Sequence, residues 1–158
     1  MKLQTGALVS SKGIKSGNVI LESGDYLMRA TKGIEVRESE RNPGVLTHIV
    51  RLKIEAGPKL EDGADSVGRS WTRFLDINPE LPYGDADNFR NDNNVDEFHD
   101  WLNAGGVKVS KTGSFDSEEI VDSLFRVRVG KNTYTVKNGP NAGEERTVNN
   151  IYKIEQGE

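Results

Sequence analysis

The 158-residue sequence has no cysteine, which excludes disulfide bonds, thiolate metal sites and cysteine nucleophiles. Hydrophobic residues make up only 34% of the chain, and no apolar run approaches the roughly 20 residues that a membrane span needs. The short apolar pieces near the start also lack the pattern of a secretory signal. We therefore expect a soluble, cytoplasmic protein of one domain, with no membrane partner.

Groups suited to catalysis are equally scarce. The only histidines are His48, which shares the parity of apolar residues on a predicted strand, and His99, which lies on a predicted helix. The simpler interpretation is that His48 is a core residue and His99 is exposed to solvent. Neither Gly33 nor Gly130 is followed by the Gly-Lys-Ser/Thr series of a phosphate loop. We predict no catalytic residue, no enzymatic activity and no cofactor.

Acidic residues gather in the middle of the chain. Residues 61–104 carry eleven Asp or Glu against three Lys or Arg, although the net charge of the whole chain is only −4. Counted from Asp92, the sixth position of a calcium loop is Glu97 instead of glycine, and the twelfth is Asn103 instead of glutamate. We therefore expect no metal site, and interpret the segment as a solvated loop and helix cap or a docking site for a basic partner. The predicted strands outside it are neutral or basic and can attract phosphates.

The 17 glycines and the strand-like blocks of valine, isoleucine and aromatic residues predict a β-rich domain. Residues 1–23 are expected to form an N-terminal arm or edge strand, residues 24–155 the domain, and residues 156–158 a short tail. One helix is predicted from about Asn94, capped through Glu97 and stopped by Gly105-Gly106. The predicted strands are residues 24–38 with a break at Gly33, residues 45–56 and 67–77 before the helix, and residues 124–129, 132–137 and 146–155 after it.

This order matches a five-stranded antiparallel barrel with a helix between its third and fourth strands, which is the layout of the OB-fold. We therefore predict a mainly β fold, an OB-fold-like β-barrel with one helix. Such barrels bind oligonucleotides on their second and third strands and on two loops, which correspond here to residues 37–44 and 138–145. A β-sandwich is the alternative, because the number of strands does not distinguish the two.

Four blocks of the sequence resemble phage-encoded single-stranded-DNA-binding and recombination-associated proteins with an OB-fold. The resemblance covers about residues 24–155 and implies a setting in DNA replication or recombination, with single-stranded DNA and proteins of those processes as partners. Many such proteins end in a long acidic tail that recruits partners, whereas only Glu155-Gln156-Gly157-Glu158 stand here, so recruitment through a tail is not expected. The resembling blocks are Gly24-Asp25-Tyr26, Trp71-Thr72-Arg73-Phe74-Leu75, DSLFRVRV at 122–129 and RTVNNIYKI at 146–154.

Proteins that bind single strands need cations along a groove and flat aromatic faces on which bases stack. Alternation places Arg51 and Lys53 on the outward face of the second strand, and it places Trp71 between two arginines on one face of the third. Trp71 also shares the parity of Leu75 and Ile77, so a core position is the alternative, and alternating arginines are often only a solvated face. The predicted nucleic-acid-binding residues are Arg51, Lys53, Arg69, Trp71, Arg73, Arg126, Arg128, Tyr134, Lys137 and Tyr152.

We predict that the protein binds single-stranded DNA in phage replication or recombination, without base-specific readout. The rival prediction, from another class, is a structural or interaction module such as a virion component or a sugar-binding β domain. The positions of the cations distinguish the two, because cations scattered over several surfaces argue against a DNA-binding trough. The sequence predicts no particular oligomeric state.

Overall fold

The computed structural model describes residues 18–157, so most of the predicted N-terminal arm lies outside the described residues. Within these residues the fold is mainly β, as predicted, with one antiparallel sheet of six strands and one α-helix. The elements are β1 (Gly24–Ala30), β2 (Glu35–Glu38), β3 (Leu46–Ala56), β4 (Ser70–Ile77), a 3-10 turn (Ala86–Asn88), α1 (Phe89–Ala104), β5 (Leu124–Thr135) and β6 (Glu145–Gln156).

β3 is the central strand of the sheet. Its first half pairs with β2 and its second half with β1, while β4 pairs along its other side. β1 in turn pairs with β5, and β5 with β6. β1 and β2 are thus the two halves of the predicted first strand, interrupted around Gly33. The predicted order of three strands, a helix and then further strands is confirmed.

β5 and α1 are both longer than expected. β5 runs through Gly130, where the sequence predicted a break, because Gly130 stays in register with Asn150 on β6. α1 begins at Phe89, ahead of the predicted start at Asn94, and the Asn94 side chain bonds the carbonyl oxygen of Asp76 at 2.9 Å instead of capping the helix. The predicted end is confirmed, since Gly105 follows the last helical residue.

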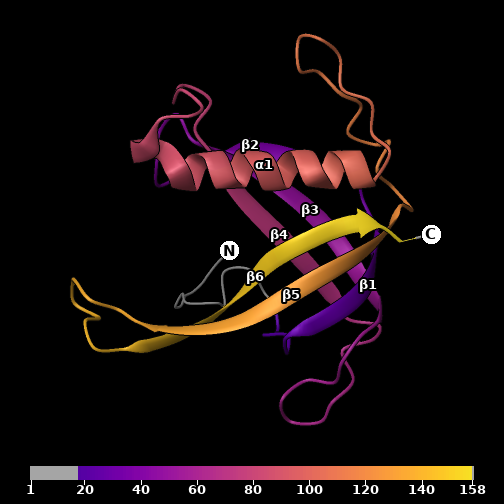
Figure 1. Ribbon diagram of the computed structural model, residues 1–158, viewed down its shortest axis with the longest axis vertical. Helices are drawn as coiled ribbons and strands as arrows, with labels where there is room; N and C mark the ends of the chain where they lie inside the picture. Colours follow the sequence, from indigo (N-terminus) through magenta and orange to yellow (C-terminus); the bar gives the residue numbers. More distant parts are fainter. Residues whose placement is uncertain (1–17, 158) are drawn as a thin grey trace.

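One hydrophobic cluster forms the core between the two halves of the curved sheet. β3 and β4 pass behind β5 and β6, and α1 lies across one end of the strands (Figure 1). α1 contributes Phe98, Trp101 and Leu102 to the cluster. No helix within residues 18–157 is both long enough and apolar enough to cross a membrane.

β4 and β6 are the two ends of the sheet, and no ladder joins them in the described chain, so the predicted barrel is not closed by strand pairing. Residues 18–21 connect the two ends instead. The side-chain amide of Asn18 bonds both backbone groups of Thr72 on β4, at 2.6 and 2.8 Å. The amide of Asn149 on β6 bonds both backbone groups of Leu21, at 2.7 and 2.8 Å. At the position where a closed barrel has a backbone ladder between its end strands, this protein therefore has hydrogen bonds from the side chains of Asn18 and Asn149.

Candidate nucleic-acid interface

The outer face of β3 carries two of the predicted cations. Arg51 and Lys53 point away from the core, as alternation predicted, because Val50, Leu52 and Ile54 fill it. Arg51 is engaged within the protein, since its guanidinium lies 2.8 Å from the carboxylate of Glu35 on β2. This face therefore offers less free positive charge than the sequence suggested.

Trp71 is not on the surface, so its predicted stacking role is wrong. Only 2% of the residue is exposed, and it packs in the core with Leu75 and Ile77, whose parity it shares. Its indole Nε1 has no hydrogen-bond partner among the described residues. A base cannot reach this ring in the folded protein. The alternative interpretation of Trp71, as a core residue, is the correct one.

Arg73 is also unavailable for DNA, for a related reason. It extends from the inner side of β4 toward α1, where its guanidinium donates two hydrogen bonds of 2.7 Å to the carboxylate of Glu97. The indole of Trp101 donates a third bond to Glu97, at 3.1 Å. The side chains of this pair are only 19% and 13% exposed. Arg69, by contrast, is exposed in the loop before β4, where its Nε bonds the backbone of Asp65.

The other predicted residues come together on the outer surface of β5 and β6, which we call the ribbon face. Arg126 and Arg128 alternate with Phe125, Val127 and Val129, which are buried. Farther along, the hairpin extends beyond the body of the protein (Figure 1), and Tyr134 pairs with Arg146 there. Lys137 is exposed in the loop that follows. The ribbon face comprises Arg126, Arg128, Asn132 and Tyr134 from β5, and Arg146, Val148, Asn150, Tyr152, Lys153 and Glu155 from β6.

Tyr152 is the most exposed aromatic of the sheet, at 62%, and Tyr134 follows at 48%. The Tyr152 ring lies against Gly130, because a Cβ at Gly130 would overlap it. Its hydroxyl accepts a hydrogen bond of 2.9 Å from the amide of Asn132, which also donates to Asn150 at 2.6 Å. Gly130 and Asn132 thus both hold the hydroxyl end of the ring, while most of the residue remains exposed, as a stacking platform requires.

Ion pairs on the ribbon face are exposed and therefore weak. Arg128 bonds Asp25 on β1 at 2.9 Å, with the two side chains 59% and 57% exposed, and this bond holds the pKa of the Asp25 carboxyl below its ordinary value. Arg146 and Lys153 pair with glutamates on their own strand or loop. A phosphate can replace such partners at little cost, whereas the buried Arg73–Glu97 pair cannot be opened in this way.

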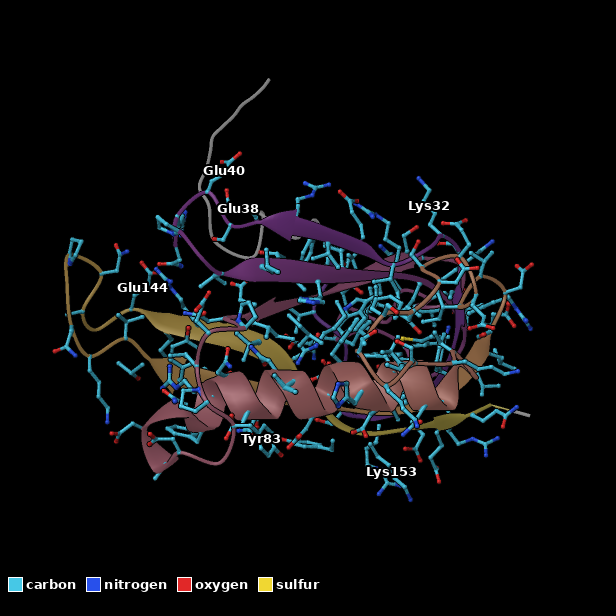
Figure 2. The ribbon with its side chains drawn as sticks, turned by 90° about the horizontal axis from the view of Figure 1, so that it is seen from above. Lys32, Glu38, Glu40, Tyr83, Glu144 and Lys153 are labelled. Atoms are coloured by element: carbon cyan, nitrogen blue, oxygen red, sulfur yellow. The ribbon has the colours of Figure 1, made fainter. Side chains whose placement is uncertain are left out.

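The ribbon face and the outer face of β2 and β3 point in opposite directions. Figure 2 shows Lys153 on one side of the molecule and Lys32, Glu38 and Glu40 on the other. The predicted cations and the indole of Trp71 therefore do not line one DNA-binding groove. Arg126, Arg128, Tyr134 and Tyr152 share one surface, and the β3 and β4 residues do not belong to it. The predicted cations are thus spread over several surfaces, which is the distribution that favours the rival structural or interaction module.

Sequence reasoning missed several members of the ribbon face. Tyr152 and Lys153 are neighbours in sequence, so strict alternation would put them on opposite sides of β6. The extra residue that β6 carries at this point, between the partners of Arg128 and Val129, turns both outward. A glycine inside one strand and a tyrosine in the next strand, where the ring can lie over the glycine, is the one sequence signal that could have found this arrangement.

The chain matches no family model, no curated protein and no solved structure. The features that bear on its function are therefore the strand order, the held ring of Tyr152 and the exposed cations beside it.

Proposed function

We propose that this protein binds single-stranded DNA along the ribbon face, in a phage replication or recombination process in the cytoplasm of the host cell. The observation that carries the proposal is the row of exposed aromatic rings and cations on β5 and β6. Tyr152 and Tyr134 supply the stacking platforms. Arg126, Arg128 and Lys153 supply positive charge near Tyr152, with Glu155 opposite Arg126, and Arg146 supplies it opposite Tyr134. Lys137 adds an exposed cation in the loop that follows β5.

The strand order supports an OB-fold in its partly open form. β1 with β2, β3 and β4 correspond to the first three strands of that fold, α1 follows the third, and β5 and β6 correspond to the last two. The pairing of the first strand with both the second and the fourth is also that of an OB-fold. In this arrangement the loop 136–144 joins strands four and five, and it is one of the two loops with which OB-folds bind oligonucleotides.

The dimensions of the ribbon face suit a short stretch of single strand. Arg126 and Tyr134 are eight positions apart on β5, which at about 3.3 Å per residue makes roughly 26 Å. Stacking on an aromatic side chain contributes about 1–3 kcal/mol per base and tolerates every base, because each has a π face. Replacing counterions on the phosphates adds an attraction that weakens as salt is raised.

The proposal is tested by titrating the full chain into a fluorescently labelled oligo-dT of about 16 nucleotides and following anisotropy. We expect binding that falls steeply between about 50 and 200 mM salt. Tyr152→Ala and Tyr134→Ala should each weaken binding by about fivefold or more, given the stacking contribution above. Phe74→Ala is the matched control, because Phe74 is 40% exposed on β4 and lies off the ribbon face.

Absence of binding at low salt would overturn the proposal and favour the rival structural or interaction module. Equal loss in Phe74→Ala and Tyr152→Ala would likewise reject the ribbon face as the interface. Binding that keeps its strength in high salt would contradict the predicted phosphate contacts of Arg126, Arg128 and Lys153.

A further inference from the structure

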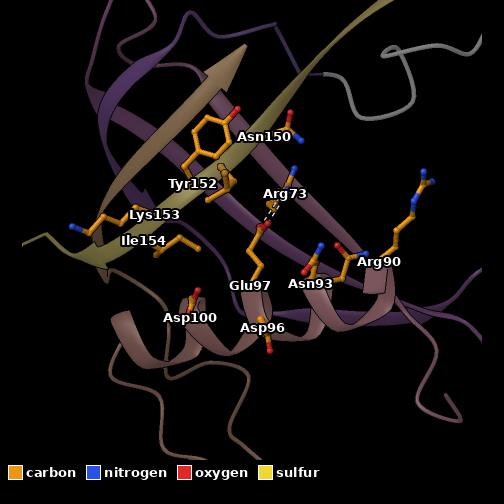
Figure 3. Close-up of a pocket in the computed structure, with 12 residues that line it drawn as sticks. Arg73, Arg90, Asn93, Asp96, Glu97, Asp100, Asn150, Tyr152, Lys153 and Ile154 are labelled. Carbon is orange, nitrogen blue, oxygen red and sulfur yellow. Dashed lines mark hydrogen bonds and ion pairs between the residues drawn. The ribbon is translucent and has the colours of Figure 1, made fainter. Parts of the chain in front are cut away.

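A groove of about 600 Å³ lies between α1 and β6, beside the ribbon face. Tyr152 and Lys153 belong to both surfaces, so a strand that follows the ribbon face passes the mouth of the groove. Figure 3 shows the residues of β6 along one side and those of α1 along the other. Its volume falls within the range of pockets that hold small organic groups.

The charged groups at the floor of the groove are bonded to each other. Arg73 and Glu97 form the bidentate pair described above, and Trp101 holds Glu97 from the core side. Ile151 and Ile154 add apolar surface from β6. A flat ring entering the groove therefore meets partly apolar walls above a floor whose polar groups already have partners.

Asp100 differs from the other carboxylates of the groove. Glu97 is bound by Arg73, and Asp96 accepts a hydrogen bond of 2.7 Å from the hydroxyl of Tyr83. No hydrogen bond or ion pair engages the Asp100 carboxylate in the described part of the chain, and its one favourable charge neighbour is the adjacent His99. Figure 3 shows it directed toward Ile154 across the groove, whereas Asp96 points away. Partial burial, together with the charges of Asp96 and Glu97, raises the pKa of Asp100.

We propose that this groove receives one unstacked base of the bound strand and that Asp100 selects a base with an exocyclic amine. A carboxylate accepts a hydrogen bond from the N4 amine of cytosine, whereas the same edge of thymine presents a carbonyl oxygen that it repels. The amides of Asn93 and Asn150 lie in the same groove and can bond the remaining polar atoms of the ring. This inference rests on the proposed function and adds to it a preference for cytosine over thymine.

The test compares the affinities of the full chain for oligo-dC and oligo-dT of equal length. We expect wild type to prefer oligo-dC by about fivefold, near the lower end of the discrimination that a base-edge contact gives. Asp100→Asn should bring the ratio close to one, mainly by tightening oligo-dT, because the repelling charge is gone. Glu80→Gln, which removes an exposed carboxylate from the loop before α1, should leave the ratio unchanged.

Equal affinity of wild type for the two oligonucleotides would overturn the base-selecting groove while leaving the ribbon face intact. A preference for oligo-dC that persists in Asp100→Asn would overturn the role of Asp100. Failure to bind either oligonucleotide would instead reject the proposed function, so the two failures are distinguishable.

Discussion

The ring of Tyr152 on β6 lies in the space that a side chain at position 130 of β5 would occupy. Gly130→Ala should therefore displace the ring and weaken oligonucleotide binding about as much as Tyr152→Ala does, by fivefold or more on the stacking scale of about 1–3 kcal/mol. Anisotropy titration with oligo-dT measures this. Thr133→Ala, on the opposite side of the same strand, should bind as wild type does. Wild-type affinity in Gly130→Ala would show that the Tyr152 ring, in its position against Gly130, is not the surface on which bases stack.

The buried pair between β4 and α1 should matter for stability. Glu97→Gln leaves the guanidinium of Arg73 without its counter-charge at a site where the two side chains are 19% and 13% exposed. We expect the free energy of unfolding, measured with urea, to fall by about 3 kcal/mol. Asp25→Asn breaks the exposed pair with Arg128 and should leave the free energy of unfolding almost unchanged. Similar losses in the two variants would contradict the difference in burial.

The asparagine contacts at the seam should hold the two ends of the sheet. Asn149→Ala removes the bonds to both backbone groups of Leu21 and a further bond of 3.1 Å to the carbonyl oxygen of Gly130. We expect a loss of about 2–3 kcal/mol in unfolding free energy and faster hydrogen exchange at the amide of Leu21. Asn150→Ala, which removes a side-chain oxygen that accepts a hydrogen bond from Asn132, is the control and should change neither the unfolding free energy nor the exchange at Leu21 by much. Unchanged exchange at Leu21 would contradict this account of the seam.

Asp100 predicts a pH dependence of stability. Its pKa in the folded protein lies above the ordinary value of 3.8, so folding disfavours its charged form. The cost is absent below the pKa of the unfolded chain and is complete once the pH exceeds the folded pKa. Asp100→Asn should therefore stabilise the protein at neutral pH, by less than about 1 kcal/mol because the groove is open to water, and the gain should vanish below the ordinary pKa. Urea unfolding of wild type and Asp100→Asn, at neutral pH and at a pH below the ordinary pKa, checks this. An equal gain in unfolding free energy at the low pH would contradict it.

Much of the fold could be predicted from the sequence, because alternation fixes which residues share a side of a strand. It correctly gave the outward positions of Arg51 and Arg126 and the order of the elements. Alternation cannot say which side faces the core. Trp71 and Arg73 share a side of β4 with Leu75 and Ile77, and this side faces the core because Leu75 and Ile77 are apolar and buried there. Arg73 can face inward with them because Glu97 on α1 forms an ion pair with it.

The candidate interface depends on contacts between strands, which a single strand pattern does not contain. Tyr152 and Lys153 face the same way only because β6 has one residue more than β5 at that point. The seat for the Tyr152 ring needs Gly130 on one strand and the bulge on the other. The start of α1 was also missed, because Asn94 uses its amide on the backbone of Asp76 instead of capping.

The position of the DNA on the protein is the central claim, and amide chemical-shift mapping tests it most directly. In a titration of the isotope-labelled full chain with oligo-dT, we predict that the amides with perturbed chemical shifts cluster at residues 126–137 and 146–153. The chemical shifts of the amides of β3 and of Trp71 on β4 should not change. Perturbations concentrated on the outer face of β3 and β4, or no perturbation at low salt, would contradict the account.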